Sequence, residues 1–113
     1  MSEDCIFCEI AQGHAPASVE YEDDSVIAFN DINPAAPVHI LIITKEHIAS
    51  VANIREKDEA LIGHMVEVGR KLAEQRHLEG YKLIFNVSKK GGQIIFHLHL
   101  HLLGGWENEA PKV

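Results

Sequence analysis

Alternating apolar and polar positions divide the chain into short strands and one long amphipathic segment. The clearest alternation lies in residues 96–103, FHLHLHLL, where histidine occupies every second position from 97 to 101 and leucine the positions between. Successive side chains of a strand point to opposite faces, so His97, His99 and His101 share one face and the leucines share the other. The pattern predicts a strand with one packed face and one face available for chemistry.

Four further stretches have strand character. Residues 18–22 and 25–31 flank an acidic turn and predict a β-hairpin. Residues 38–44, VHILIIT, are rich in β-branched side chains and predict a largely buried strand. Residues 81–87 and the stretch from Gln93 through the histidines are joined by SKKGG, whose glycines permit the positive φ angles of a hairpin turn.

The segment from about 54 to 78 predicts a long amphipathic helix. Asn53 and Glu56 have the spacing of a capping box, and Gly80 is a stop signal after the segment. Its apolar stripe consists of Leu61, Met65, Val68 and Leu72. Residues 5–12 predict a short N-terminal helix. Together the elements predict an α+β fold, a five-stranded, mainly antiparallel sheet with one long and one short helix.

Composition is that of a single globular domain over residues 1–113, with a C-terminal tail at about 106–113. The chain is 46% hydrophobic and 24% charged, and its net charge of -7 argues against a nucleic-acid polymer as partner, because such binders carry a basic face. No apolar run approaches the roughly 20 residues that span a bilayer, and the N-terminus lacks the pattern of a signal peptide. We therefore expect a cytoplasmic protein that does not bind membranes.

Three imidazoles on one strand face admit three interpretations. They are a metal site, because neutral histidine is the commonest metal ligand, or a nucleophile with supporting acid and base groups. The third is a solvated face, for which Thr, Lys or Glu would be better suited. The preceding NVSKKGGQ stretch offers amide donors, backbone N–H groups and positive charge, which together favour a phosphate site. These groups are Asn86, Gln93, Gly91, Gly92, Lys89 and Lys90.

Motifs across nearly the whole chain resemble the histidine triad (HIT) family. They are IFCEI, FNDINPAAPVHILIITKEHI, the stretch from Asn86 to Gln93, and HLHLHLLGG, whose ending is most similar to the nucleotide-binding, phosphoramidase-like branch. The resemblance implies a HIT-like fold and a homodimer. It also implies hydrolysis of purine nucleoside 5'-phosphoramidates, such as AMP or GMP joined to an amine, with no cofactor required for catalysis.

The resemblance also implies roles for the histidines. His99 would attack the α-phosphorus and form a nucleotidyl-histidine intermediate, His101 and His39 would form a supporting hydrogen-bond relay, and His97 would flank the phosphate or a metal. The implied phosphate site comprises Asn86, Gln93, Gly92, His99 and His101.

A nucleoside site is implied in the same way. Asp31 matches the residue that accepts hydrogen bonds from the ribose hydroxyls, and Asn30, at the edge of the base pocket, replaces a histidine common in animal members. The apolar walls of the base slot match Ile6, Phe7, Ile10, Phe29 and Ile32. Taken singly, these apolar residues are also ordinary core residues, and Asp31 is an ordinary turn residue. Ile94 stands where many members carry serine, so the resemblance does not fix the rate or the leaving-group preference.

Cys5 and Cys8 form a Cys-x-x-Cys motif, which in a reducing compartment favours metal binding, or no special role, over a disulfide. Some family members hold a structural zinc with such a motif and two histidines, which correspond here to His47 and His97. The resemblance thus implies a closed zinc site that pins the N-terminal helix to the sheet. The alternative is two half-buried thiols and a surface His47.

Other functions remain open at this level. A metalloenzyme using the triad as ligands would leave Asn86, Gln93 and Asp31 unexplained. A dinucleoside polyphosphate hydrolase and a nucleotide-binding regulatory protein with little turnover would use the same residues. The remaining histidines are expected to be structural: His14 in a loop, His64 on the buried or dimer-facing side of the long helix, and His77 in its last turn.

Overall fold

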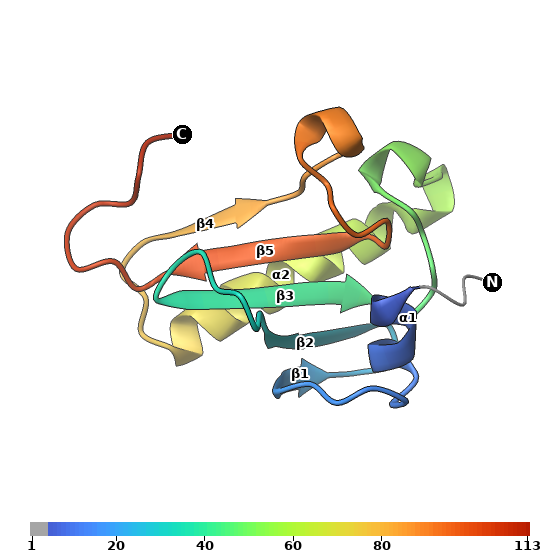
Figure 1. Ribbon diagram of the computed structural model, residues 1–113, viewed down its shortest axis with the longest axis horizontal. Coiled ribbons are helices and arrows are strands. Elements are labelled where there is room, and N and C mark those ends of the chain that lie inside the picture. Colours follow the sequence, from blue (N-terminus) through green and yellow to red (C-terminus); the bar gives the residue numbers. More distant parts are fainter. Residues whose placement is uncertain (1–4) are drawn as a thin grey trace.

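A five-stranded antiparallel sheet forms the centre of the computed structural model, which describes residues 5–113 (Figure 1). Its strands are β1 (Val19–Glu22), β2 (Val26–Asn30), β3 (Val38–Thr44), β4 (Tyr81–Ile84) and β5 (His99–Gly104), in the spatial order β1-β2-β3-β5-β4. Every neighbouring pair is antiparallel. The predicted α+β fold is confirmed.

Two helices cover the two faces of this sheet (Figure 1). The long helix α2 (Glu59–Gln75) packs on one face, and the short helix α1 (Ile6–Ala11) lies on the other, near the end of β3. Short 3-10 helices occupy Val51–Asn53, Glu56–Asp58 and Lys89–Gly91. None of the helices in residues 5–113 is both long and apolar enough to cross a membrane.

The alternation along β5 separates a packed face from a chemical face. On the α2 side, Leu100 and Leu102 of β5 join a core with Ile40, Ile42 and the predicted apolar stripe of α2. On the α1 side, Leu41 and Ile43 of β3 pair in register with His101 and His99 of β5. The predicted division between histidines and leucines is therefore confirmed within β5.

The boundaries of α2 differ from the sequence prediction. The helix begins at Glu59 rather than near residue 54, because Ser50 caps a separate 3-10 turn and the Asp58 carboxylate accepts the backbone N–H of Arg55 at 3.0 Å. It ends at Gln75, well before Gly80. After it, the backbone N–H groups of residues 76–78 donate to carbonyls of the last turn of the helix, and His77 takes the left-handed conformation at φ 56.

The strands on either side of the predicted SKKGG turn are also shorter than expected. β4 ends at Ile84 and β5 begins only at His99, so residues 85–98 form a long connection that contains a 3-10 helix. Residues 93–98 contain β-branched and aromatic residues typical of a strand, but Leu98 donates its backbone N–H to the carbonyl of Ile48, beyond the end of β3. Tertiary contacts thus replace the expected ladder.

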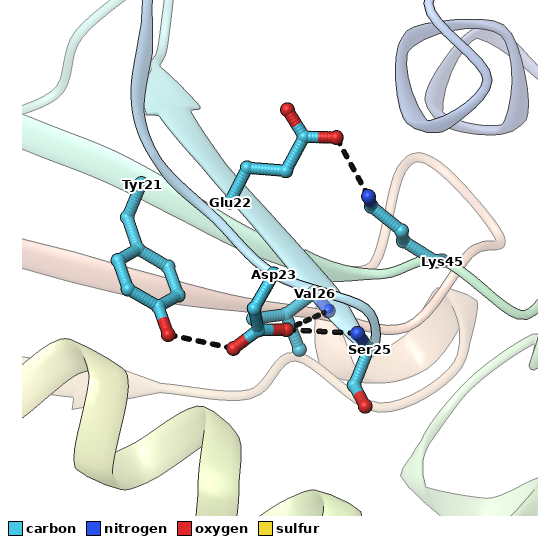
Figure 2. A network of polar contacts seen from close by, with 6 residues as sticks. All are labelled: Tyr21, Glu22, Asp23, Ser25, Val26 and Lys45. Atoms are coloured by element: carbon cyan, nitrogen blue, oxygen red, sulfur yellow. Dashed lines mark hydrogen bonds and ion pairs between the residues drawn. The ribbon is translucent and has the colours of Figure 1, made fainter.

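The turn between β1 and β2 is held by the carboxylate of Asp23 (Figure 2). Oδ1 accepts the backbone N–H groups of Ser25 and Val26, and Oδ2 accepts the Tyr21 hydroxyl at 2.7 Å. His64 of α2 lies 2.6 Å from the same Oδ2, which links the helix to the turn. Partial burial raises the pKa of Asp23, but these hydrogen bonds outweigh that effect and hold it well below its usual range.

Replacing Asp23 by alanine is expected to lower the free energy of unfolding by about 2 kcal/mol, because two backbone donors and one hydroxyl lose their acceptor. Urea unfolding at pH 7 measures the change. Asp24→Ala, at the exposed neighbouring position, is the control and should change stability by less than about 0.5 kcal/mol. A loss for Asp23→Ala no larger than that of the control would contradict the assignment.

Candidate active site and metal cluster

A cleft of about 400 Å³ opens on the α1 side of the sheet, and we call it the histidine cleft. His39 of β3 and His99 and His101 of β5 line it, together with Asp31 and Asn86. An adjoining space of about 390 Å³, the apolar cavity, shares several walls with the cleft. Its lining includes Ile6, Phe7, Ile10, Phe29, Asn30, Asp31 and Ile32. The residues expected at the phosphate and at the nucleoside thus lie in two adjacent spaces.

His99 presents one ring nitrogen with a fixed role. Its Nδ1 lies 2.7 Å from the backbone oxygen of His97. A carbonyl oxygen only accepts, so Nδ1 carries the proton and Nε2 keeps the lone pair in the neutral ring. Burial, as the largest cause, lowers the pKa of His99, although the hydrogen bond to His97 opposes this shift. The arrangement therefore provides a neutral imidazole with one unprotonated nitrogen.

His39 and His101 form a hydrogen-bonded pair with a defined direction. The backbone N–H of Ala35 donates to Nδ1 of His39 at 3.0 Å, so in the neutral ring Nε2 of His39 bears the proton. That nitrogen lies 2.9 Å from Nδ1 of His101 and donates to it. His101 must then carry its own proton on Nε2. The carboxylate of Asp31, whose Oδ2 lies 3.4 Å from Nε2 of His39, places a negative charge next to the pair.

The expected phosphate donors in the loop after β4 lie in different environments: some line the histidine cleft, and one is buried in the loop. Asn86 and Gly92 line the histidine cleft, and Gly92 has the left-handed conformation at φ 89. Gln93 is buried, and its amide bonds only to backbone: Nε2 donates to Ala49 and Ile95, and Oε1 accepts the N–H of Ser88. Gln93 therefore braces the loop. The exposed Lys89 and Lys90 are not among the residues that line the cleft.

The expected nucleoside residues are of two kinds: apolar side chains that line the apolar cavity, and polar side chains that form hydrogen bonds at its edge. Phe7, Ile10 and Phe29 are buried, whereas Ile6 and Ile32 are exposed by 46% and 90% at the apolar cavity. Asp31 Oδ1 accepts the backbone N–H of Asn33 at 2.8 Å and retains capacity for further donors. Asn30 directs its amide Nδ2 to Glu20 at 2.7 Å and to Ser18. Its side chain is thus already occupied at the edge of β2.

Cys5, Cys8, His47 and His97 converge on the α1 side of the sheet, and we call them the metal cluster. Nδ1 of His97 lies 3.2 Å from Cys5 Sγ and 3.4 Å from Cys8 Sγ. Nδ1 of His47 lies 3.2 Å from Cys8 Sγ and 3.3 Å from Nδ1 of His97. Tetrahedral zinc requires about 3.3 Å between nitrogen ligands and about 3.6 Å between sulfur and nitrogen, so the donor set fits.

Hydrogen bonding and burial around the metal cluster determine which of its atoms can bind a cation. Nε2 of His97 lies 2.7 Å from the backbone oxygen of Thr44 and so carries the proton, which leaves Nδ1 as the ligand atom. Burial, as the largest cause, together with the neighbouring Cys5, raises the pKa of the Cys8 thiol to about 11. Because a bound metal requires the thiolate, metal affinity rises with pH. His97 faces this cluster and not the histidine cleft, although it stands two residues from His99.

Comparisons with known proteins agree with this geometry. A family model described as "Scavenger mRNA decapping enzyme C-term binding" matches residues 4–110. The chain is 46% identical to a HIT-like protein of Synechococcus elongatus over 93% of each chain. It is 44% identical to the purine nucleoside phosphoramidase of Escherichia coli, over 93% of this chain and 90% of that protein. The chain belongs to the histidine triad (HIT) family.

Solved structures of HIT proteins match the fold closely. A HIT family hydrolase from Clostridium thermocellum has a TM-score of 0.93 and 46% identity, covering 100% of this chain and 99% of that one. A zinc-bound histidine triad protein from Mycobacterium smegmatis has a TM-score of 0.82 and 30% identity, covering 94% and 78%. The family and fold predictions are confirmed, and the chain is a HIT family hydrolase.

The remaining histidines of this HIT protein have structural positions. His14 lies exposed in the loop after α1, as expected. The side chain of His64 is 39% exposed and contacts Asp23, so within this chain it joins α2 to the β1–β2 turn and does not enter the core. His77 lies just beyond α2 and not in its last turn.

Several groups that shape the HIT site were not predicted from the sequence. The Ala35 N–H sets the direction of the His39–His101 pair, and the Thr44 carbonyl orients His97. Backbone atoms leave no residue-type signal, so neither could be found from the sequence. Asn33 and Ile95 also line the histidine cleft. Asn33 precedes a proline and looked like part of a turn, and Ile95 looked like a strand residue.

The pH dependence of folding should report on His101. Burial, followed by the neighbouring His99 and His39, lowers the pKa of His101 to about 4, whereas an unfolded histidine has about 6.5. Between these values the unfolded chain binds a proton that the folded protein does not. Stability from this group is therefore complete above about pH 6.5 and is lost as the pH falls toward 4.

Between pH 7.5 and pH 5, we expect the free energy of unfolding of His101→Gln to decrease less than that of the unsubstituted protein. Urea unfolding at both pH values gives the difference, and effects of the metal cluster are common to both proteins. His14→Gln on the exposed loop is the control. Equal pH dependence in the unsubstituted protein and His101→Gln would refute the assignment.

Proposed function

We propose that this HIT hydrolase cleaves the P–N bond of purine nucleoside 5'-phosphoramidates, such as AMP joined to an amine. The observation that carries the proposal is the hydrogen bond from Nδ1 of His99 to the His97 carbonyl. It leaves the unprotonated Nε2 of a neutral ring, on a residue that lines the cleft, available for nucleophilic attack. The 44% identity to a purine nucleoside phosphoramidase supports the same substrate class.

The proposed reaction has two displacements at phosphorus. Nε2 of His99 attacks the α-phosphorus, the bond from phosphorus to the amine breaks, and the departing amine takes a proton from solvent. Water then attacks the nucleotidyl-histidine, which breaks the new N–P bond, restores His99 and releases the nucleotide and a proton. The protons taken up and released balance, and the net change is hydrolysis of the P–N bond of the phosphoramidate.

The charge that develops on phosphorus needs donors, and we assign them to the cleft. The Nε2 proton of His101, oriented by His39 and Asp31, donates to a nonbridging oxygen in this proposal. Asn86 lines the same cleft; its Nδ2 donates one proton to the Gly91 carbonyl at 3.1 Å and keeps the second as a further donor. Gly92 lines the cleft beside it, but its backbone N–H donates to Lys89, so we assign it a role in shaping the phosphate site. We assign Gln93 a supporting role, because its amide is bonded to the loop backbone.

The apolar cavity is assigned to the purine base and Asp31 to the ribose hydroxyls. Its walls of Phe7, Ile10, Phe29 and the exposed Ile6 and Ile32 offer stacking and apolar contact. We assign no residue that distinguishes adenine from guanine. As the family resemblance implies, we further propose that the protein acts as a homodimer, and light scattering in solution would test this.

The metal cluster is assigned to a structural zinc. When bound, zinc supplies a cross-link between α1, the segment after β3 and the segment just before β5. The four protein ligands complete a tetrahedral site, so no position is left for substrate. His97 serves as a ligand in this proposal, and no chemical step uses the metal.

Release of AMP from adenosine 5'-phosphoramidate by the purified, zinc-loaded protein tests the proposed function. We expect a higher kcat/KM for this substrate than for diadenosine tetraphosphate, which has no P–N bond. Rapid acid quenching followed by mass spectrometry should find a nucleotide on the peptide that contains His99. Preference for the dinucleotide would identify a polyphosphate hydrolase, and binding without turnover of either would identify a regulatory protein.

A further inference from the structure

The metal cluster and the histidine cleft share two short stretches of chain. Cys5 and Cys8 bracket Phe7 at α1, and His97 stands two residues before His99. A group that fixes the cluster therefore also fixes residues that line the cleft. This inference rests on the proposed roles of His99 and the apolar cavity.

The first connection runs through the backbone of His97. Its ring is held between the cluster, through Nδ1, and the Thr44 carbonyl, through Nε2, and it is fully buried. The carbonyl of the same residue accepts the Nδ1 proton of His99 at 2.7 Å. The atom that selects the tautomer of the nucleophile thus belongs to a metal ligand.

The second connection runs through Phe7. Its ring packs edge-on against His99 with ring centroids 5.1 Å apart, and it also contacts Phe29 at 5.6 Å. The same ring lines both the histidine cleft and the apolar cavity. Helix α1 has only six residues, too few to be stable alone, so its position depends on what anchors its ends. The cluster holds both cysteines that flank this ring.

We propose that the metal cluster positions the active site, so that zinc occupancy sets nucleotide affinity and turnover without zinc taking part in the reaction. In the loaded protein the His97 carbonyl holds His99 as the Nδ1–H tautomer, and Phe7 closes the wall between the two spaces. In the zinc-free protein α1 and the segment before β5 lose their common anchor. His99 then samples both tautomers, and the apolar cavity loses a fixed wall.

The test compares zinc-loaded, chelator-stripped and zinc-reconstituted protein, with folding checked by circular dichroism. We expect stripping to weaken AMP binding about tenfold by calorimetry and to lower kcat about tenfold, with both restored by zinc. Nitrogen-15 NMR should show one His99 tautomer when loaded and averaged ring signals when stripped. Unchanged AMP affinity and ring signals in stripped, folded protein would overturn the proposal and leave the cluster a purely structural anchor.

Asp23→Ala in the zinc-loaded protein is the matched control for lost stability. It lies in the β1–β2 turn outside both spaces, so its melting temperature should fall while AMP affinity and the His99 signals stay unchanged. If the stripped protein unfolds, the comparison of stripped and zinc-loaded protein is made in a stabilising osmolyte such as trimethylamine N-oxide, which favours the folded state without supplying the metal anchor. Weaker AMP affinity and averaged His99 signals in the stripped protein would support the proposal, and values identical to those of the zinc-loaded protein would overturn it.

These readouts separate the inference from the proposed reaction. AMP affinity and the tautomer of His99 are measured without any turnover. If the protein fails to cleave phosphoramidates but both readouts respond to zinc, the positioning role stands and only the reaction is wrong. If it cleaves them and neither readout responds, the positioning role fails alone.

Discussion

Replacing His99 by alanine is expected to lower kcat for release of AMP from adenosine 5'-phosphoramidate by at least about 10⁴-fold. The proposed route has no second nucleophile: His101 offers an N–H toward the substrate, and its other nitrogen is occupied by His39. Loss of an activated nucleophile removes the covalent path and leaves only binding and charge stabilisation. Initial-rate assays at pH 7.5 measure the effect.

Two controls make the result specific to the nucleophile. His14→Ala, on the exposed loop after α1, should keep the full rate. Circular dichroism and AMP binding must show that His99→Ala folds and still holds nucleotide, because the ring of His99 also packs against Phe7. A folded His99→Ala protein retaining a tenth of the unsubstituted kcat would exclude the nucleotidyl-histidine route.

Replacing Cys8 by serine is expected to lower the free energy of unfolding of the zinc-loaded protein by at least about 3 kcal/mol. A structural zinc site contributes its binding free energy to folding, and loss of one of four ligands removes much of it. The buried serine also leaves a hydroxyl where the thiolate stood, at a position only 7% exposed. Urea unfolding with and without added zinc measures the loss.

The same comparison in excess chelator isolates the contribution of the metal. Without metal, the unsubstituted protein and Cys8→Ser should differ by about 1 kcal/mol or less, because serine and cysteine differ little in size. Bound zinc, counted by atomic absorption, should fall from about one ion per chain to a small fraction. Equal stabilities in zinc and in chelator would show that these residues do not form a zinc site.

The sequence predicted elements best where the residue types of a whole stretch favour one structure. The β-branched run at 38–44 became β3 over the same residues, because β-branched side chains suit a strand that is buried on both faces. The alternation in β5 likewise predicted which side chains would pack and which would face the cleft. In both cases the period of the pattern matched the period of the structure.

Boundaries were predicted less well, because they depend on contacts from elsewhere in the chain. Ser50 caps one 3-10 turn and the Asp58 carboxylate accepts the Arg55 N–H of a second, so α2 begins only after both turns, at Glu59. Residues 93–98 have a strand pattern, but the buried amide of Gln93 and the contacts of Leu98 with Ile48 fold them into a connection. Local propensity could not rank these competing bonds.

By itself, the sequence determined the fold class, the face that carries the histidines and the four residues that meet in the metal cluster. These follow from periodicity, residue type and family resemblance, all of which are written along the chain. Only the tertiary structure decided that His97 does not line the histidine cleft, that Gln93 braces a loop, and which nitrogen of each histidine carries a proton. Those outcomes depend on backbone groups, namely the carbonyl oxygens of His97, Thr44 and Ala49 and the Ala35 N–H. Every residue has such backbone groups, so only their positions in the folded chain distinguish them.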